Sequence, residues 1–442
     1  MKLSSYWWDI DQDLSPKLEA KLPKSADIVV IGGGFTGLSA ALTAARNGRS
    51  VVVLDAGQPG FGASTRNGGI CSGHLRIPHA QLTSKFGKDF ADSVYGEGID
   101  ARADLVQFCE EEKIDCQINQ AGHFNGAMSL KAYDQMGRQA DALNAIPGHD
   151  VEVIPRARQH QEIATDRFYG GLLRREIGGY HPGKFFAGLL KVVTREGVKI
   201  IADMPAQSIE DDHAAQTAGA KLVNTAKGTI KAVTVIVATN GYNHKEKSFG
   251  HFIRKRIVPV RSCIIVTEQL GEERVKALMP GLRMYGNTDK VSAYFRPVPD
   301  QDRILLGARS FDPETPGPRT IRFLRNKLVG MLPQLSDVQI EYCWLGNVAF
   351  NRRLLPGMFS DNGVHYACGY AGSGTVWARW LGKKTAEMAM GMTGGPNGTA
   401  PSAFYDKPPQ AVPFYDGNPW FMPYVVGFFA AQDKVSEWGN RR

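Results

Sequence analysis

The chain of 442 residues is predicted to be an α/β protein with a second domain of the α+β class. Three stretches carry this prediction: a strand–turn–helix–strand unit at residues 27–55, a β-rich region at about 257–342, and a strand–loop–helix unit at 364–390. The outer two are typical of one parallel sheet, and the short alternating segments between them are typical of an antiparallel sheet. We therefore expect two interleaved domains, one on each kind of sheet.

The first unit begins with a branched apolar strand at residues 28–31 and continues into Gly32-x-Gly34-x-x-Gly37. Apolar residues then recur at helical spacing, a second strand follows at 51–54, and Asp55 stands at its end. In this arrangement Gly32 makes the turn, Gly34 allows a pyrophosphate to approach the backbone, and Gly37 allows close packing of helix and strand. A glycine-rich turn without a ligand would not explain the acid at this distance. The unit predicts a Rossmann-like dinucleotide-binding domain.

A second glycine-rich loop spans residues 60–69. Its polar and glycine residues are Ser64, Thr65, Arg66, Asn67, Gly68 and Gly69. Exposed backbone N–H groups of such a loop suit a phosphate or an oxidised ring system. A long surface loop is the alternative, but closeness to the first turn favours a ligand.

The middle of the chain alternates between helical and strand patterns. Helices are predicted at 91–113, 132–144, 184–196 and 320–332, and strands at 198–201, 229–239, 262–268, 292–297 and 304–307. From these we expect an N-terminal arm (1–26), a discontinuous cofactor domain (27–90, 150–245 and 340–400), a substrate domain (91–149 and 246–339) and a C-terminal tail (401–442).

Near the C-terminus, a strand at 364–368 leads into the loop Gly369-Tyr370-Ala371-Gly372-Ser373-Gly374 and a helix from Thr375. Two strand–glycine loop–helix units so far apart suggest one extended cofactor held at both ends. A flavin dinucleotide, FAD, fits this better than a nicotinamide, which needs no C-terminal glycine loop.

Both ends of the chain carry aromatic residues. The arm contains Tyr6, Trp7 and Trp8, which we expect to pack across the body rather than to bind a partner. The tail contains the apolar stretch 420–431, for which packing on the body is favoured over docking to a membrane surface or another subunit.

Composition excludes several classes of function. The net charge of +8 comes without a clustered basic run, which argues against nucleic-acid binding. The six cysteines show no metal-ligand spacing, and neither a signal peptide nor a membrane-spanning stretch is evident. We expect a cytoplasmic protein with reduced thiols, no bound metal and no membrane contact.

These motifs resemble the FAD-dependent amine and amino-acid oxidoreductases of the D-amino acid oxidase family, which includes glycine and sarcosine oxidases. The matching pieces include IGGGFTGLSAALTAARNG, GASTRNGG, YFRPVPDQDRILLGA, WLGNVAFNRRLLPG and YACGYAGSGT, and the branch most similar is that of gamma-glutamylputrescine oxidoreductase-like proteins. The resemblance implies a cofactor site formed by Gly32, Gly34, Phe35, Thr36, Gly37, Asp55, Ser64, Thr65, Arg66, Asn67, Gly68, Gly69, Ala206, Gly241, Gly369, Tyr370, Gly372, Ser373, Gly374 and Thr375.

Departures from the family pattern refine this expectation. Asp55 stands where Glu is frequent, and Ser373 replaces a frequent His. Val348 occupies the slot of the arginine that binds the substrate carboxylate in glycine oxidase-like relatives, which favours an amine, or a carboxylate placed differently; Arg352 is a nearby replacement or a surface residue. The slot of a flavin-linked His is Arg66, and no Cys lies between residues 351 and 365, so we expect non-covalent FAD.

The resemblance implies oxidation of a C–N bond in a secondary amine or N-substituted amino acid, by hydride transfer to FAD and hydrolysis of the imine. Oxygen or another acceptor would reoxidise the flavin. No catalytic base is evident; the candidates for the substrate side are Tyr242, Tyr294, Arg296, Trp344 and Arg352. A D-amino acid or glycine-type deaminating oxidase, a nicotinamide-dependent dehydrogenase and a non-catalytic flavoprotein subunit remain as alternatives.

Overall fold

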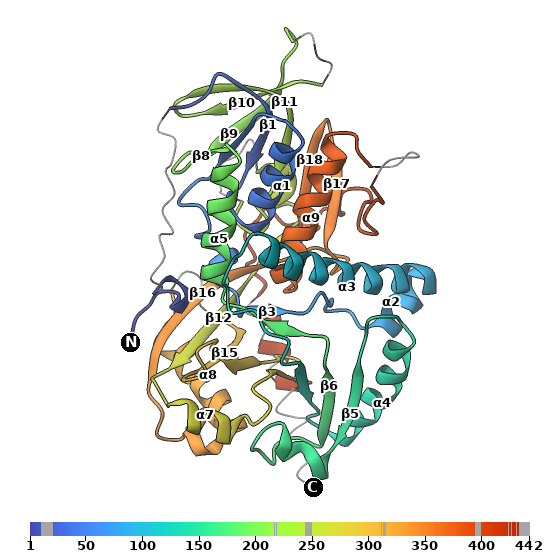
Figure 1. The fold of residues 1–442 in the computed structure, drawn as a ribbon, viewed down its shortest axis with the longest axis vertical. Coiled ribbons are helices and arrows are strands. Elements are labelled where there is room, and N and C mark those ends of the chain that lie inside the picture. The colour runs from blue at the N-terminus through green and yellow to red at the C-terminus, as the bar shows by residue number, and fades with distance from the viewer. Residues whose placement is uncertain are drawn as a thin grey trace.

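A computed structural model describes residues 1–9, 21–215, 217, 219–243, 250–310, 312, 315–393, 399–422, 424, 425, 427–429, 431 and 432. Two large sheets organise this part of the chain, and they occupy the upper and lower halves of Figure 1. The fold class predicted from the sequence is confirmed.

The first sheet, the cofactor sheet, has the order β17-β18-β11-β1-β2-β8, with β10 and β9 added beside β11. Its central pairs are parallel, as in a doubly wound sheet, whereas β17, β9 and β10 run antiparallel to their neighbours. Its strands are β1 (Ser25–Ile31), β2 (Val51–Leu54), β8 (Lys199–Ile201), β9 (Ala206–Asp211), β10 (Lys221–Thr225), β11 (Gly228–Val237), β17 (Gly357–Asp361) and β18 (Val364–Cys368).

The second sheet, the substrate sheet, has the order β16-β12-β15-β14-β13-β4-β6-β5. It is antiparallel except for the parallel pair β13 and β4, so it is mixed rather than purely antiparallel as expected. Its strands are β4 (His123–Gly126), β5 (Val151–Pro155), β6 (Gly170–Arg174), β12 (Val258–Thr267), β13 (Met284–Asn287), β14 (Tyr294–Pro297), β15 (Ile304–Arg309) and β16 (Ile340–Phe350). A separate small sheet joins β3 (Ile70–Cys71) to β7 (Gly178–Gly179).

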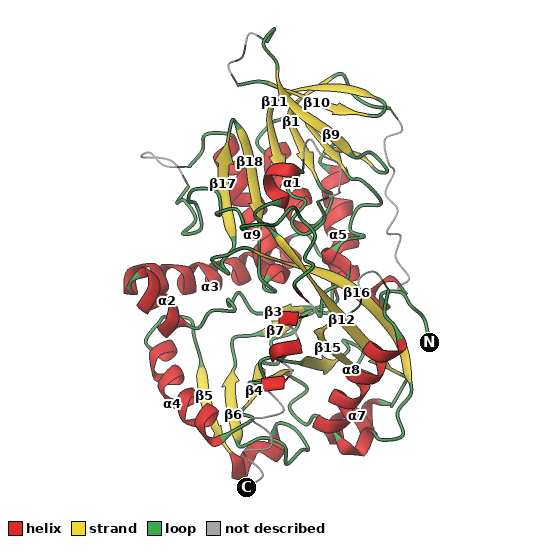
Figure 2. Ribbon diagram, turned by 180° about the vertical axis from the view of Figure 1, so that it is seen from behind, coloured by secondary structure: helices red, strands yellow, loops and turns green. Residues whose placement is uncertain are grey.

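The helices cover both sheets (Figure 2). Helices α1 (Phe35–Arg46), α5 (Pro182–Arg195) and α9 (Gly374–Ala389) pack on the cofactor sheet, and α3 (Lys88–Glu111) runs across the middle of the molecule below α9. The others are α2 (His79–Phe86), α4 (Leu130–Asn144), α6 (His251–Arg254), α7 (Glu272–Leu278) and α8 (Pro318–Met331). Buried apolar residues of α1, α5 and α9 form one core with β1 and β2.

The domain boundaries expected from the sequence need correction at two places. Strands β5 and β6 were expected in the cofactor domain, as part of 150–245, but they pair at one margin of the substrate sheet. Strand β16, expected there as part of 340–400, pairs along its whole length with β12. In both cases the local pattern gives a strand correctly, but the partner that decides its sheet is distant in the sequence.

The two ends differ from each other. Trp7 is fully buried, so the described residues 1–9 of the arm pack on the body as expected, whereas residues 10–20 lie outside the described part. In the tail, Phe421 and Met422 pack against a small cluster around Val258, whereas Trp420 and Tyr424 are largely exposed. Packing of the apolar stretch on the body is therefore only partial among its described residues; positions 423, 426 and 430 lie outside them.

Candidate cofactor and substrate site

A cavity of about 420 Å³ crosses the carboxyl ends of the parallel strands. Gly32 follows β1, Asp55 follows β2, and Tyr370 follows β18, and all three line it. This is the edge at which an open α/β sheet binds its ligand. The cavity lies beside the turns that the glycine motifs form, and the binding role expected for those residues stays a prediction.

The turn after β1 requires glycine for two separate reasons. Gly32 has φ of +107°, and a Cβ there would lie 2.8 Å from the carbonyl oxygen of Ala238. A Cβ on Gly37 would lie only 1.8 Å from the oxygen of Gly32, so α1 and the turn pack backbone to backbone. The first turn of α1 carries no acidic side chain, and its positive end faces the cavity. A diphosphate suits such a helix start.

Asp55 fixes the turn and lines the cavity. Its Oδ2 accepts a hydrogen bond from Gly33 N–H at 2.7 Å, and its Oδ1 accepts one from Gly57 N–H at 2.9 Å. The cavity continues past Asp55 to Ala206 and Gln207, the first two residues of β9. This end has the shape and the acid expected for a ribose and its base.

The loop at 60–69 is held in place by the N-terminal arm. Trp7 Nε1 donates to the carbonyl oxygen of Asn67 at 2.6 Å, and Trp8 Nε1 donates to Thr65 Oγ1 at 2.8 Å. On the other side, Ser64 Oγ accepts from the N–H of Phe35 at 2.9 Å. The loop therefore joins the arm to the start of α1.

The C-terminal glycine loop closes the other end of the cavity. The hydroxyls of Tyr370 and Thr36 are hydrogen-bonded at 2.8 Å, which ties this loop to the start of α1. Gly372 has φ of +107°, and an added Cβ would meet only Val348, at 3.9 Å. Helix α9 then begins with no acidic residue in its first turn. A partly negative ring system fits beside this helix start.

A second cavity of about 410 Å³ meets the first. Six residues line both, namely Ala63, Asn67, Asn347, Val348, Gly372 and Thr375. One elongated cavity with two helix starts along it, joined to a second cavity at one end only, fits FAD with its reactive ring at the junction. The residues present therefore fit this cofactor, and the second cavity is the candidate for the substrate side.

Three arginines that the sequence reasoning missed line the second cavity: Arg76, Arg174 and Arg309. Burial, followed by the positive charge of Arg76, lowers the pKa of Arg309 to about 10, and both guanidinium groups lie over the Phe350 ring. Arg309 directly follows the stretch YFRPVPDQDRILLGA, but no local signal in the sequence marks its side chain as facing a cavity. The same holds for Arg174, at the end of β6.

Next to these arginines, His74 lines the cavity and contacts Glu176. Glu176 Oε1 lies 3.1 Å from His74 Nε2 and 3.2 Å from His149 Nδ1. Burial lowers the pKa of His74 to about 3, so its ring is neutral at pH 7. These three side chains place ligand atoms within 4.8 Å of one another, a spacing that could hold a metal ion. Hydrogen bonding already explains the grouping, and the expected absence of a metal stays a prediction.

The candidates for the substrate side separate into two groups. Tyr294 lines the substrate cavity, and Tyr242 lines the cofactor cavity, where its hydroxyl accepts a hydrogen bond from Asn347 N–H at 3.1 Å. Arg296 is instead buried against the second loop and donates to the oxygens of Gly69 and Tyr180 at 2.7 and 3.1 Å.

Trp344 and Arg352 likewise lie away from the substrate. Trp344 is buried and donates through Nε1 to the oxygen of Arg66 at 3.1 Å, and Arg352 is exposed. The predicted roles of Arg296, Trp344 and Arg352 are therefore corrected to structural or surface positions, because their strands or loops direct these side chains elsewhere.

The residues predicted to bind the cofactor fall into three groups in the structure. Those that line the first cavity are Gly32, Gly34, Phe35, Thr36, Asp55, Ser64, Asn67, Ala206, Tyr370, Gly372, Gly374 and Thr375. Arg66, Gly68 and Ser373 line the substrate cavity. The remaining ones support the walls: Gly37 packs the turn, Thr65 binds Trp8, Gly69 accepts from Arg296, Gly241 accepts from Asn347, and Gly369 donates to Asn240.

Comparison with known proteins agrees with this geometry. The model of the family described as "FAD dependent oxidoreductase" (DAO) matches residues 27–388. The chain belongs to this family. Among curated proteins, a DAO-family relative in Escherichia coli, gamma-glutamylputrescine oxidoreductase, is 28% identical over 368 residues, which are 83% of this chain and 84% of that protein. The probable oxidoreductase OrdL of Haemophilus influenzae is 28% identical over 370 residues, covering 83% of each chain.

Solved structures of similar fold include glycine oxidase from Geobacillus kaustophilus. It has a TM-score of 0.71 and 16% identity, and the match covers 84% of this chain and 96% of that one. L-proline dehydrogenase from P. horikoshii follows with a TM-score of 0.68 and 19% identity, over 85% and 96% of the two chains. At these identities the likeness shows a shared fold. Within the described part of the DAO-family chain, no helix has both the length and the apolar character needed to cross a membrane.

Proposed function

We propose that this FAD-dependent oxidoreductase oxidises a C–N bond in a secondary amine or an N-substituted amino acid. The observation that carries the proposal is the junction of the two cavities at Asn347, Val348 and Gly372. A substrate in the second cavity reaches the cofactor only across this junction. FAD, when bound, supplies the acceptor for the hydride removed from the carbon beside nitrogen.

The substrate cavity favours an amine that also bears a carboxylate. Arg309 and Arg76 lie together over Phe350, at 5.0 and 5.9 Å from the ring centroid. None of the described residues that line this cavity is acidic. A carboxylate bound to a guanidinium pair would supply the missing charge. This carboxylate would bind at a different place from Val348, the position of the carboxylate-binding arginine in glycine oxidase-like relatives. The absence of an arginine at 348 favoured such a different placement.

The same positive charge helps to prepare the amine. Hydride leaves readily only from a carbon next to a neutral amine nitrogen. Positive charges nearby lower the pKa of an ammonium group, because they disfavour its charged form. Arg76, Arg174 and Arg309 therefore promote loss of the substrate proton to solvent without a dedicated base. The oxidised product is an imine, which water converts to a carbonyl compound and an amine.

We also propose that FAD is held without a covalent bond. Arg66, in the slot of a flavin-linked His, is engaged elsewhere: its Nε donates to the oxygen of Phe61 at 2.8 Å and its guanidinium lies over the Trp8 ring. The cysteines are buried in the described structure. Acid precipitation of the purified protein should release the yellow flavin into the supernatant.

The decisive experiment is a visible spectrum of the purified protein, followed by anaerobic addition of secondary amines and N-substituted amino acids. We expect a flavin spectrum that one class of compound bleaches. Recovery of colour with peroxide on admitting air would identify oxygen as the acceptor. Bleaching by primary α-amino acids alone would favour the deaminating oxidase, and a flavin that no amine reduces would favour a non-catalytic flavoprotein.

A further inference from the structure

The substrate cavity holds three guanidinium groups for which the described protein provides no hydrogen-bond acceptor or ion-pair partner. Arg174 and Arg309 are partly buried and carry the argument, whereas Arg76 is exposed at the edge of the cavity. Within the described part of the chain, none of the three guanidinium groups has a hydrogen bond or an ion pair within 4.0 Å. The guanidinium groups of Arg76 and Arg309 instead contact the Phe350 ring. Buried charges in folded proteins are usually paired, so groups of this kind point to a ligand that pairs them.

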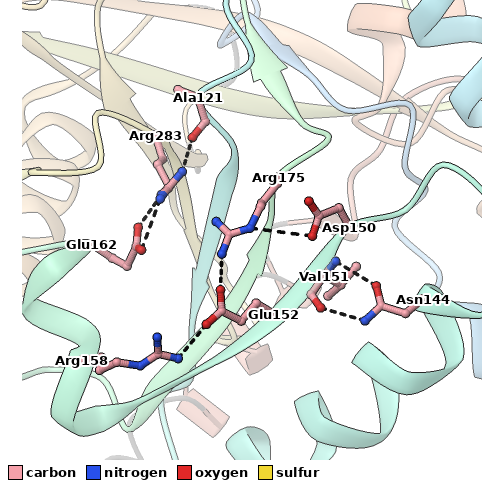
Figure 3. A network of polar contacts seen from close by, with 9 residues as sticks. All are labelled: Ala121, Asn144, Asp150, Val151, Glu152, Arg158, Glu162, Arg175 and Arg283. Atoms are coloured by element: carbon pink, nitrogen blue, oxygen red, sulfur yellow. Dashed lines mark hydrogen bonds and ion pairs between the residues drawn. The ribbon is translucent and has the colours of Figure 1, made fainter.

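Three arginines close to the ends of strands in this sheet show the ordinary arrangement, paired with acids (Figure 3). Arg175 pairs with Glu152 and lies 3.7 Å from Asp150, Arg158 pairs with Glu152 at 2.6 Å, and Arg283 pairs with Glu162. Arg174 is the last residue of β6, and Arg175, whose N–H still bonds to the oxygen of Asp150 before β5, directly follows it. Successive side chains along a strand point to opposite faces. The charge of Arg175 on one face is thus neutralised by acids, whereas Arg174 on the other face lines the cavity.

The nearest acid to Arg174 is occupied by other groups. Glu176 hydrogen-bonds to both His74 and His149, and its Oε2 accepts from the N–H of Asp150 at 3.4 Å. Its oxygens lie more than 4.0 Å from the Arg174 guanidinium, since no ion pair forms between these described residues. Glu176 therefore weakens the positive potential of Arg174 but leaves its donors available.

The arginines form two separate positive groups. Arg309 ends β15 and Arg174 ends β6, and the strands β14, β13 and β4 lie between them. At a strand spacing of about 4.8 Å, these two strands are roughly 19 Å apart along the sheet. Burial lowers the pKa of both arginines, but the neighbours that act electrostatically on Arg309 are Arg76 and Tyr294, whereas those that act on Arg174 are Tyr95 and Glu176. The two groups thus face different ends of a bound molecule.

We propose that the substrate is a secondary amine with two carboxylates, one bound by Arg309 and Arg76 and the other by Arg174. Side chains of His123, Asn125 and Gln139 also line the cavity and would surround the second carboxylate with polar groups. This inference rests on the proposed function and names its substrate class. An N-(carboxyalkyl) amino acid has the required chemistry.

The test compares matched pairs of compounds by anaerobic flavin reduction. N-(carboxyalkyl)glycines with one to ten methylenes before the second carboxylate, a range that reaches across the separation of the two strands, are compared with the amides of that second carboxylate, which keep size but lose one charge. We expect at least one dicarboxylate to show an apparent Kd at least 10-fold lower than that of its amide. Arg174→Gln should remove this ratio and leave the amide unchanged, whereas Arg309→Gln should weaken both.

Two variants control for folding and charge. Arg174→Lys keeps the positive charge and should keep part of the preference. Arg352→Gln removes an exposed arginine and should leave all constants as in the wild type. Flavin content of each variant shows whether the cofactor cavity is intact.

A second readout separates this inference from the proposed function. Non-oxidisable α,ω-dicarboxylates with three to twelve methylenes, and monocarboxylates of the same lengths, are titrated against the oxidised flavin spectrum. If a dicarboxylate binds more tightly than the matched monocarboxylate, Arg174→Gln removes the difference, and no amine reduces the flavin, then the two-carboxylate site is supported and amine oxidation is contradicted. If N-substituted monocarboxylates are oxidised with the same Kd as dicarboxylates, amine oxidation stands and the two-carboxylate inference is overturned.

Discussion

Gly372 leaves space for the cofactor because it has no side chain. Its φ of +107° favours glycine, yet an added Cβ would meet no atom closer than Val348 at 3.9 Å. Crowding by the protein therefore does not explain the residue. Gly372 and Val348 line both cavities, so the open space beside Gly372 is space that the flavin ring would fill.

We predict that Gly372→Ala lowers FAD occupancy, with a Kd for FAD at least 10-fold higher in a flavin fluorescence titration. The matched control is Gly391→Ala, since Gly391 also has a positive φ, +71°, and nothing within 4 Å of an added Cβ. Both changes carry a backbone cost of about 1–2 kcal/mol. Equal FAD binding by the two variants would show that only the backbone matters at Gly372.

At the scale of elements, the crossing of α1 and α9 sets the distance between the two helix starts at the cofactor cavity. A Cβ on Gly382 of α9 would lie 2.3 Å from the carbonyl oxygen of Thr36 in α1. Thr36 also binds Tyr370 in the loop that precedes α9. The close approach of the two backbones is therefore part of the site.

We predict that Gly382→Ala destabilises the protein by about 1–3 kcal/mol through overpacking. It should also lower FAD content, because it separates the two helix starts. Alanine has the better helix propensity, so the matched control Gly137→Ala in α4, with open space around it, should instead stabilise by about 0.5–1 kcal/mol. Thermal midpoints and the flavin-to-protein ratio measure both effects. A rise in the midpoint of Gly382→Ala would contradict the role of the crossing.

Local patterns in the sequence were enough for the elements and the glycine turns, and the predicted helices appear as α3, α4, α5, α8 and α9. Local patterns were not enough to predict which sheet a strand joins, because β16 pairs with β12, which lies about 80 residues earlier in the chain. The same limit applies to side chains. Arg296 and Arg309 lie in neighbouring strands, yet Arg296 binds the backbone of Gly69 while Arg309 faces the cavity. That difference depends on which loop covers each strand.

At the scale of the whole molecule, buried neutral histidines couple stability to pH. Burial lowers the pKa of His74 to about 3 and those of His123, His181 and His365 to about 4. Below pH 6.5 the unfolded chain binds protons at these sites and the folded protein does not. Stability must therefore fall as pH falls from about 6.5 to about 4. Hydrogen bonds hold the pKa of Glu176 below its usual range despite its burial, and loss of its charge at still lower pH acts in the same direction.

We predict that the thermal midpoint is nearly constant from pH 8 to 7 and decreases steadily toward pH 4. Each buried histidine contributes up to about 1.4 kcal/mol per pH unit, since one proton separates the two states. His365 lies in β18, where its Nδ1 is hydrogen-bonded to Ser360 Oγ at 2.8 Å, and it lines neither cavity. His365→Gln should lower the midpoint at pH 8 through loss of packing, yet decrease less steeply below pH 6.5. Midpoints of wild type and variant that fall in parallel would show that His365 takes up its proton equally in both states.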